Sequence, residues 1–308
     1  MADEVFALLF PGQGAQTVGM AGAWCLEHAA ARAIFDRASA VLGYDLLEIC
    51  QHGPAERLNT TAVSQPAILV TSLAMLEVLR TREDSPFAGN AVESLTAGLS
   101  LGEYTALVHA GSLDLESAVR VVDVRGRAMQ ACADASPGGM VAVLGLDRQQ
   151  VQQVCDEARG GDILEVANVL CPGNIVVSGS QSACERVPEA AAADGAMKCV
   201  PLEVAGAFHT RLMEPAREKL AAVLEEVELR APRIAVISNV DAQPHTEPAE
   251  IRGLLSRQVC GAVEWQASME HLLSTGVGSL WEVGPGRVLR GLLKRIDRKR
   301  PCQGVIDS

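Results

Sequence analysis

A serine that lies between two glycines is the first pattern in this chain that could supply a catalytic nucleophile. Gly98-Leu99-Ser100-Leu101-Gly102 fits G-x-S-x-G. Residues 93–98 read as a strand and 101–111 as a helix, and a nucleophilic serine is presented in that strand-turn-helix context. The glycines would let strand and helix approach closely, and Ser100 would stand at a helix N-terminus, which favours negative charge. The alternative is an ordinary turn with a capping serine.

A serine nucleophile needs a base, and His209 is the best placed of the six histidines. It lies in VAGAFHT, where the chain leaves a compact central unit and rejoins the rest of the protein. No nearby acid is an obvious third triad member, so a backbone or amide carbonyl is expected to hold the second ring N–H. A surface histidine is the alternative for His209. The histidines expected at the surface are His28, His52, His109, His245 and His271.

Arg125 is a cation with apolar neighbours. On a helix, the residues three and four positions away are Val121, Val122, Ala128 and Met129. Burial of a guanidinium is very costly unless an anion matches it. That anion is either an internal carboxylate or a substrate carboxylate, which a guanidinium binds with two parallel hydrogen bonds.

The elements needed to position these residues are those of an α/β protein. Short apolar runs bounded by Pro and Gly predict buried strands, and longer apolar-periodic runs predict helices. Asp114 is the expected N-terminal cap of the helix predicted over residues 113–135. The expected strands are 5–10, 93–98, 233–240 and 279–286, and the expected helices are 65–80 and 113–135.

The middle of the chain has a separate order of predicted elements, β-α-β-β-α-β, which is the ferredoxin-like pattern. Its expected strands and helices are 140–146, 147–158, 163–169, 174–180, 182–196 and 198–205. We therefore expect a large α/β-hydrolase-like domain with a parallel sheet, made of residues 1–135 and 206–308, and an inserted ferredoxin-like domain, 136–205. A cleft between two domains is a usual place for a small-molecule site.

Composition narrows the classes of function. The chain has 308 residues, a formal net charge of −12 and only 3% aromatic residues. The acidic charge argues against a nucleic-acid partner. No run of about 18 apolar residues is expected to span a membrane, and the N-terminus MADEVFALLFPG does not read as a signal peptide. Nine cysteines without C-x-x-C or zinc spacing fit buried thiols in a reducing compartment, so a cytoplasmic protein is expected.

Several motifs together resemble one family, the malonyl-CoA:acyl carrier protein transacylases of fatty acid synthesis, and the chain is similar to the acyltransferase domains of polyketide synthases. The resemblance covers nearly the whole chain and matches the layout given above. Its motifs are FPGQGAQTVGM (10–20), SQPAI (64–68), GLSLGEYTAL (98–107), RGRAMQ (125–130), GAFHT (206–210), SNVDA (238–242) and EVGPGRVL (282–289).

The resemblance implies roles for the residues at matching positions. Ser100 would be the nucleophile, His209 its base and Arg125 the residue that holds the malonyl carboxylate. Gln13 and Leu101 would give backbone N–H groups to the oxyanion. The main-chain carbonyl of Gln258 would orient the histidine, and Gln65 and Asn168 would lie near the site.

Two departures from the family pattern bear on the pocket. The usual motif is G-H-S-L-G-E, and Leu99 stands here in place of its histidine. The stretch Asn168 to Asn174, NVLCPGN, replaces a more polar N-x-N-S-P-G-Q, so Leu170 and Cys171 are expected to make that pocket wall less polar. Phe208 precedes the base, and the similarity to malonyl-selective polyketide domains suggests that its ring leaves no room for a methylmalonyl group.

The activity implied is that of an [acyl-carrier-protein] S-malonyltransferase. Malonyl would pass from malonyl-CoA to Ser100 and then to the phosphopantetheine thiol of acyl carrier protein. No cofactor or metal is expected, because a thioester is already activated. The alternatives are a serine hydrolase that edits acyl carrier proteins, a polyketide-type acyltransferase using another acyl-CoA, and a carrier-binding protein without catalysis.

A basic cluster near the C-terminus stands out in an acidic chain. It comprises Arg290, Lys294, Arg295, Arg298, Lys299 and Arg300. We expect it to help dock an acidic carrier protein. The alternative is a solvated helix end, where cations are favourable anyway.

Overall fold

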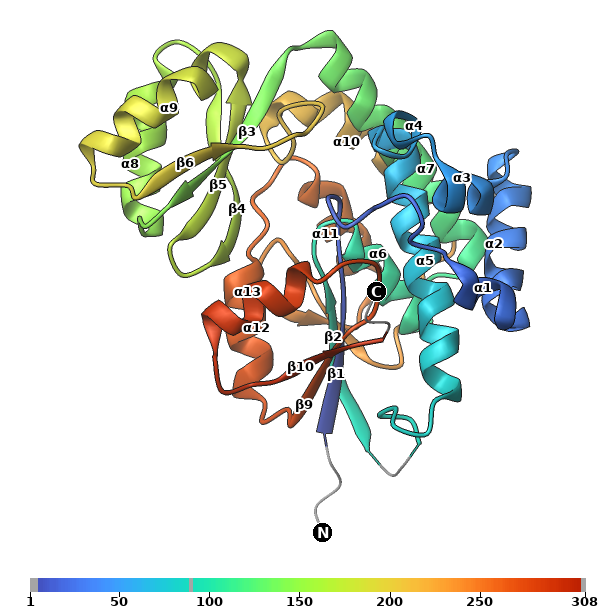
Figure 1. Cartoon of the computed structure of the whole chain (residues 1–308). Helices are drawn as coiled ribbons and strands as arrows, with labels where there is room; N and C mark the ends of the chain where they lie inside the picture. Colours follow the sequence, from blue (N-terminus) through green and yellow to red (C-terminus); the bar gives the residue numbers. More distant parts are fainter. Residues whose placement is uncertain (1–4, 89–90, 306–308) are drawn as a thin grey trace.

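Two β-sheets organise the molecule (Figure 1). The computed structural model describes residues 5–88 and 91–305. The strands of sheet A are β1 (Val5–Phe10), β2 (Val92–Gly98), β7 (Ala235–Ile237), β8 (Pro244–His245), β9 (Ser279–Glu282) and β10 (Cys302–Gly304). They lie in the order β10-β9-β1-β2-β7-β8, and all neighbours are parallel except β7 and β8. The expected parallel sheet is confirmed.

Helices cover both faces of sheet A because its central strand is apolar on both sides. Phe6, Leu8 and Phe10 of β1 belong to one hydrophobic cluster, and Ala7 and Leu9 belong to another. Helices α2, α5, α7 and α10 lie on the first side, and α12 and α13 on the second (Figure 1). The helices are α1 (Ala23–Glu27), α2 (Ala29–Leu42), α3 (Leu46–His52), α4 (Ala55–Leu58), α5 (Thr61–Thr81), α6 (Gly102–His109), α7 (Leu115–Ala135), α10 (Glu214–Glu226), α11 (Pro248–Gln258), α12 (Trp265–Ser274) and α13 (Val288–Ile296).

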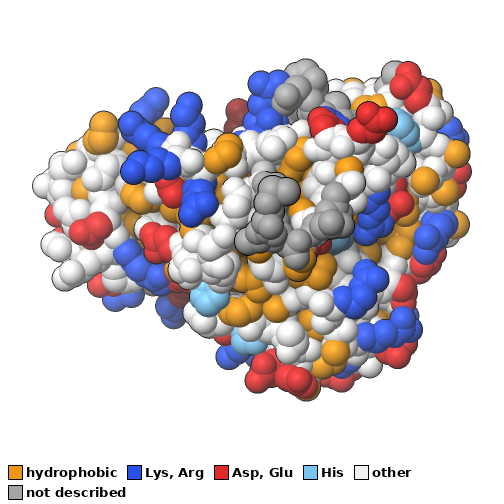
Figure 2. All heavy atoms as spheres, turned by 90° about the horizontal axis from the view of Figure 1, so that it is seen from below, with side chains coloured by type: hydrophobic (Ala, Val, Ile, Leu, Met, Phe, Trp, Pro, Cys, Tyr) orange, Lys and Arg blue, Asp and Glu red, His pale blue; other side chains and the backbone are white. Residues whose placement is uncertain are grey.

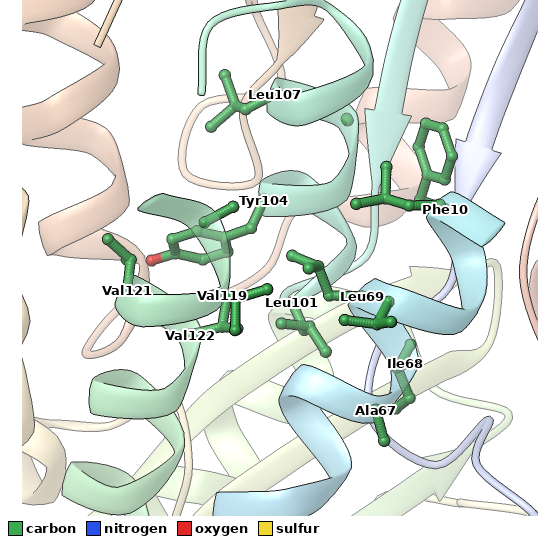
Figure 3. Packing of buried hydrophobic residues seen from close by; sticks show 14 of the residues in the cluster. Phe10, Ala67, Ile68, Leu69, Leu101, Tyr104, Leu107, Val119, Val121 and Val122 are labelled. Carbon is green, nitrogen blue, oxygen red and sulfur yellow. The ribbon is translucent and has the colours of Figure 1, made fainter. Parts of the chain in front are cut away.

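The helix after the G-x-S-x-G turn is anchored in the first of these clusters. Figure 3 shows Leu101 and Tyr104 pointing into the space between α6, α5 and α7. Leu69 of α5 and Val119 and Val122 of α7 lie around them, and all five side chains are buried. Burial of aliphatic side chains of this size contributes roughly 1.5–3 kcal/mol each, so the start of α6 has little freedom to move.

Sheet B forms a separate layer at the upper left of Figure 1. Its strands are β3 (Gly138–Leu144), β4 (Leu164–Cys171), β5 (Asn174–Ser180) and β6 (Lys198–Pro201), and its helices are α8 (Arg148–Arg159) and α9 (Gln181–Ala193). The order β4-β5-β3-β6 is antiparallel throughout, as the ferredoxin-like pattern requires. Asp147 caps α8 in a capping box with Gln150.

Some predicted boundaries differ. Helix α5 begins at Thr61, four residues before the expected start, and β6 ends at Pro201 rather than continuing to residue 205. The predicted absence of any stretch apolar enough to span a membrane is wrong for α5, which has a mean hydropathy of 1.6. However, 83% of its most apolar window is buried inside the protein. The apolarity of α5 therefore reflects its place between sheet A and α7.

Candidate active site

The G-x-S-x-G segment forms a sharp turn between β2 and α6. Ser100 adopts a left-handed backbone conformation with φ of 50°, which is uncommon for a residue other than glycine. A Cβ on Gly98 would lie 1.9 Å from the carbonyl carbon of Gly102, and a Cβ on Gly102 would lie 2.1 Å from the oxygen of Phe10. Both positions therefore require glycine, and the turn exposes Ser100 to the pocket described below.

Asn239 braces this turn from the end of β7. Its Oδ1 accepts a hydrogen bond from the backbone N–H of Ser100 at 2.5 Å, and its Nδ2 donates to the carbonyl of Gly98 at 2.8 Å. The residue lies in the SNVDA stretch, but sequence reasoning gave it no role. The motif itself was the available signal, because an amide that directly follows a buried strand at the same sheet edge can reach the turn after β2.

His209 and Ser100 are in hydrogen-bond contact. The distance from Ser100 Oγ to His209 Nε2 is 2.9 Å, and His209 Nδ1 lies 2.9 Å from the carbonyl oxygen of Gln258. The carbonyl can only accept, so Nδ1 carries the proton and Nε2 is free to receive one. Burial, and to a lesser extent the positive charge of Arg125, lower the pKa of His209 to about 4. The imidazole is therefore neutral at pH 7, as a general base must be.

Arg125 is buried beside the serine, with 1% of its surface exposed. Its Nη1 donates to Gln65 Oε1 at 2.7 Å, and its Nη2 donates to Gln258 Oε1 at 3.0 Å and to Ser100 Oγ at 3.1 Å. The guanidinium also stacks over the Tyr104 ring at 5.4 Å. Its hydrogen-bond partners among the described residues, Gln65, Ser100 and Gln258, are neutral. Burial lowers the pKa of Arg125, while the charge of nearby Glu103 raises it, so the site would gain from a bound anion.

A pocket of about 600 Å³ opens over these residues. Ser100, Arg125 and His209 line it, and so do several other residues that the sequence had placed in the site: Gln13, Leu99, Asn168 and Phe208. Residues of sheet B and of the segment after β6 form the opposite wall: Met140, Asn168, Leu202, Glu203 and Val204. The pocket thus lies between the two sheets, where a cleft was expected.

Sheet B is held to this position by a backbone bridge. Val169 donates to the carbonyl of Val263 at 2.9 Å, and Val263 donates to the carbonyl of Ala167 at 2.8 Å. Asn168 lies within this bridge, and its buried Oδ1 has no hydrogen-bond partner among the described residues. A polar group from bound substrate could satisfy that oxygen.

The remaining predicted residues lie next to the pocket. Leu101 follows Ser100 directly at the start of α6 and is buried. Gln65 reaches the site only through Arg125, while its Nε2 lies 3.4 Å from the sulfur of Met129. Gln258 meets the site twice, through its backbone carbonyl at His209 and through its amide at Arg125.

Two expectations about individual residues are wrong. Leu170 and Cys171 do not line the pocket; they pack against a hydrophobic cluster that includes Trp265, because they follow the bridge to Val263. His109 is not at the surface. It is buried, and its Nε2 lies 2.8 Å from a carboxylate oxygen of Glu93.

No group of three or more His, Cys, Asp or Glu side chains within residues 5–88 and 91–305 is arranged to hold a metal ion. One connected hydrogen-bonded set surrounds Ser100 instead, made by the side chains of His209, Arg125, Gln65 and Gln258. In this arrangement His209 can activate the hydroxyl group of Ser100, and Arg125 can bind an anion beside it.

Comparison with known proteins agrees with this geometry. Residues 7–295 match the acyl transferase domain family. The malonyl CoA-acyl carrier protein transacylase of Escherichia coli K12 is 42% identical over 291 residues, covering 94% of this chain and 92% of the relative. The crystal structure of an acyl carrier protein S-malonyltransferase from Vibrio cholerae superposes with a TM-score of 0.92 at 40% identity, covering 98% of this chain and 97% of that one.

A further solved structure is a malonyl-transacylase in complex with a type II PKS acyl-carrier protein. It superposes with a TM-score of 0.92 at 40% identity and covers 99% of this chain and 97% of that one. The family match and these similarities span almost the full chain. This chain therefore belongs to the acyl transferase domain family.

Proposed function

We propose that this protein transfers the malonyl group from malonyl-CoA to the phosphopantetheine thiol of acyl carrier protein, as an [acyl-carrier-protein] S-malonyltransferase. The observation that carries the proposal is the position of Arg125, a buried cation with neutral partners 3.1 Å from Ser100 Oγ. In a malonyl group one carbon separates the thioester carbonyl from the carboxylate. Ser100 can therefore attack the carbonyl while the Arg125 guanidinium binds the carboxylate. The names of the relatives support the same activity.

The first half-reaction acylates the enzyme. His209 Nε2 accepts the proton of Ser100 as Oγ attacks the thioester carbonyl carbon. The backbone N–H groups of Gln13 and Leu101 stabilise the oxyanion, and each such donor is typically worth ~2.7–4 kcal/mol. The C–S bond then breaks, and His209 returns the proton to the sulfur of CoA.

The second half-reaction runs the same steps in the opposite direction. The carrier's thiol gives its proton to His209 and attacks the malonyl-serine ester. The ester bond to Oγ breaks, and Oγ recovers the proton. Throughout, the carbonyl of Gln258 holds His209 in the tautomer that leaves Nε2 unprotonated. Phe208 in the pocket wall would limit the space beside the malonyl methylene, and such size selection contributes about 1–3 kcal/mol.

We also propose a cytoplasmic location. The cysteines at described positions are all free thiols, and most of them are buried. Unpaired thiols fit a reducing compartment.

Trapping of the acyl-enzyme tests the proposed function. Wild-type protein mixed with malonyl-CoA should gain the mass of one malonyl group, located on Ser100 by peptide mass spectrometry. The Ser100→Ala variant should gain none, and His209→Ala should acylate more slowly by orders of magnitude. Addition of phosphopantetheinylated carrier protein should then remove the label as malonyl-carrier. Release of free malonate instead would indicate a hydrolase, and a stable adduct on Ser100→Ala would refute the assigned nucleophile.

A further inference from the structure

Glu103 is a buried carboxylate with no part in the steps given above. It lies three residues after Ser100 in the first turn of α6, with 3% of its surface exposed. Its Oε2 accepts hydrogen bonds from the backbone N–H of Asn239 at 3.0 Å and from Gln258 Nε2 at 2.7 Å. Burial raises its pKa to about 7, and these hydrogen bonds oppose that rise. Burying a carboxylate is unfavourable unless hydrogen bonds compensate, so the groups that bond to Glu103 indicate its role.

Gln258 is the side chain that Glu103 holds, and its amide lies between Glu103 and Arg125. Nε2 donates to Glu103 and to the carbonyl of Ser100 at 3.0 Å, while Oε1 accepts from Arg125 Nη2 at 3.0 Å. The two ends of this amide are not interchangeable. A flipped amide would place an NH2 group against a guanidinium, which can only donate, and an oxygen against a carboxylate.

We propose that Glu103 is a positioning residue for carboxylated acyl groups: by fixing the Gln258 amide, it aims the Arg125 guanidinium at the pocket. The inference rests on the proposed function, because the malonyl carboxylate is what Arg125 would receive there. Glu103 itself lines no part of the pocket. Two hydrogen bonds in series connect it to the guanidinium, from Glu103 to Gln258 and from Gln258 to Arg125, and its charge also acts on Arg125 directly.

The hydrogen bond between Ser100 Oγ and His209 Nε2 is not made through this amide, although the amide also donates to the carbonyl of Ser100. His209 bonds to the backbone carbonyl of Gln258, and Ser100 keeps its own bond to Asn239 Oδ1. An acyl group without a carboxylate, such as acetyl, therefore reports on the turn and the base alone. Loss of Glu103 should reduce acylation by malonyl-CoA much more than acylation by acetyl-CoA.

The test compares kcat/KM for enzyme acylation by malonyl-CoA with that by acetyl-CoA. Glu103→Leu should lower the malonyl-to-acetyl ratio by about tenfold to a hundredfold, the range for losing a hydrogen bond to a charged group. Glu103→Gln keeps an acceptor oxygen and should restore the ratio to within about threefold of wild type. The matched control is Glu282→Leu, because Glu282 is also buried and accepts hydrogen bonds at the start of α13, from the backbone N–H groups of Leu289 and Arg290. It should leave the ratio unchanged.

A double variant shows whether Glu103 acts through Arg125. In an Arg125→Ala background, Glu103→Leu should not change the ratio further, since the guanidinium it orients is gone. Equal losses for both acyl groups, or a further drop in that background, would show that Glu103 only supports the turn and would overturn the proposal. If Glu103→Leu fails to fold by circular dichroism, Gln258→Met removes the same link and must lower the ratio likewise.

The same data separate this inference from the proposed function. A wild-type enzyme without preference for malonyl would defeat both. A malonyl-selective wild type whose ratio survives Glu103→Leu would defeat the inference alone.

Discussion

Arg125 is where a single side chain should decide which acyl group the enzyme accepts. Its hydrogen-bond partners are the neutral groups of Gln65, Ser100 and Gln258. Arg125→Ala should therefore lower the rate of malonyl transfer by about a hundredfold or more, as expected for the loss of a buried charged contact. The rate of acetyl transfer should be kept or increased. Parallel assays with the two CoA esters measure this. Equal losses for both would mean that Arg125 has a structural role.

His209 sets the pH dependence of acylation. Its pKa is lowered to about 4 by burial and by Arg125. Single-turnover acylation should then stay level through neutral pH and fall only as the pH approaches about 4. Because this pKa lies below the ordinary 6.5, acid also favours the unfolded protein, and stability should decline as the pH drops below 6.5. A rate that already halves near pH 6.5 would contradict the lowered pKa.

Single residues differ in how far sequence alone could place them. Arg125 was identifiable because its helical neighbours are apolar, and Ser100 because glycines flank it. For Asn239 the SNVDA motif was a signal, but its partner could not be read from the sequence, because the contact with Ser100 spans 139 positions. His109 was misplaced for the same reason. Its burial depends on Glu93, which lies on a different element, and no local pattern reveals such a partner.

At the scale of elements, the crossing of β2, α6 and β1 decides whether Ser100 is presented at all. A Cβ at position 102 would lie 2.1 Å from the carbonyl oxygen of Phe10. Gly102→Ala should therefore force the start of α6 away from β1, destabilise the protein by about 1–3 kcal/mol and reduce acylation more than tenfold. Urea denaturation and malonyl labelling measure the two effects.

Gly291→Ala is the matched control for that change. Gly291 lies within α13, and a Cβ there meets nothing within 4 Å. Alanine should be neutral or stabilise by up to about 1 kcal/mol, because it is the better helix former. If Gly102→Ala were as stable and active as Gly291→Ala, close packing at the turn would not be what requires glycine.

Strands and helices were predictable wherever apolar periodicity and caps coincide. Helix α7 begins after Asp114, whose side chain accepts from the N–H of Ser117, and the β-α-β-β-α-β order of sheet B follows from the alternation of its segments. The short helices α1 to α4 were not predicted, because tertiary contacts rather than periodicity define such short segments. Division into a domain of residues 1–135 and 206–308 and an inserted domain of 136–205 stays a prediction.

Over the whole molecule, the uneven distribution of charge bears on how a carrier protein docks. The chain carries a net charge of −12, yet Lys and Arg side chains gather in groups on the face shown in Figure 2. Three cations at the C-terminal end, Lys294, Arg298 and Lys299, are exposed. Arg295 is also exposed, but it and Arg290 have structural contacts. Arg290 pairs with Glu282, and Arg295 donates to the carbonyls of Pro172 and Gly173.

Lys294, Arg298 and Lys299 are therefore the ones to test as a docking surface for an acidic carrier protein. Replacing Lys294, Arg298 and Lys299 with alanine should slow malonyl transfer to the carrier by about tenfold at low salt, because charges of this kind mainly accelerate encounter. The difference should shrink at 0.15 M salt, where the screening length is about 8 Å. Acylation by malonyl-CoA should change less, although CoA is itself an anion. A control variant removes three exposed arginines from α2 and α7, on the other side of sheet A: Arg32, Arg120 and Arg127. Both variants lose the same charge, so a general electrostatic effect would slow them equally. If the C-terminal residues form a local docking surface, the Lys294/Arg298/Lys299 variant should be slow and the Arg32/Arg120/Arg127 variant should keep its rate. Wild-type kinetics with the carrier in the C-terminal variant at low salt would show that the carrier docks elsewhere.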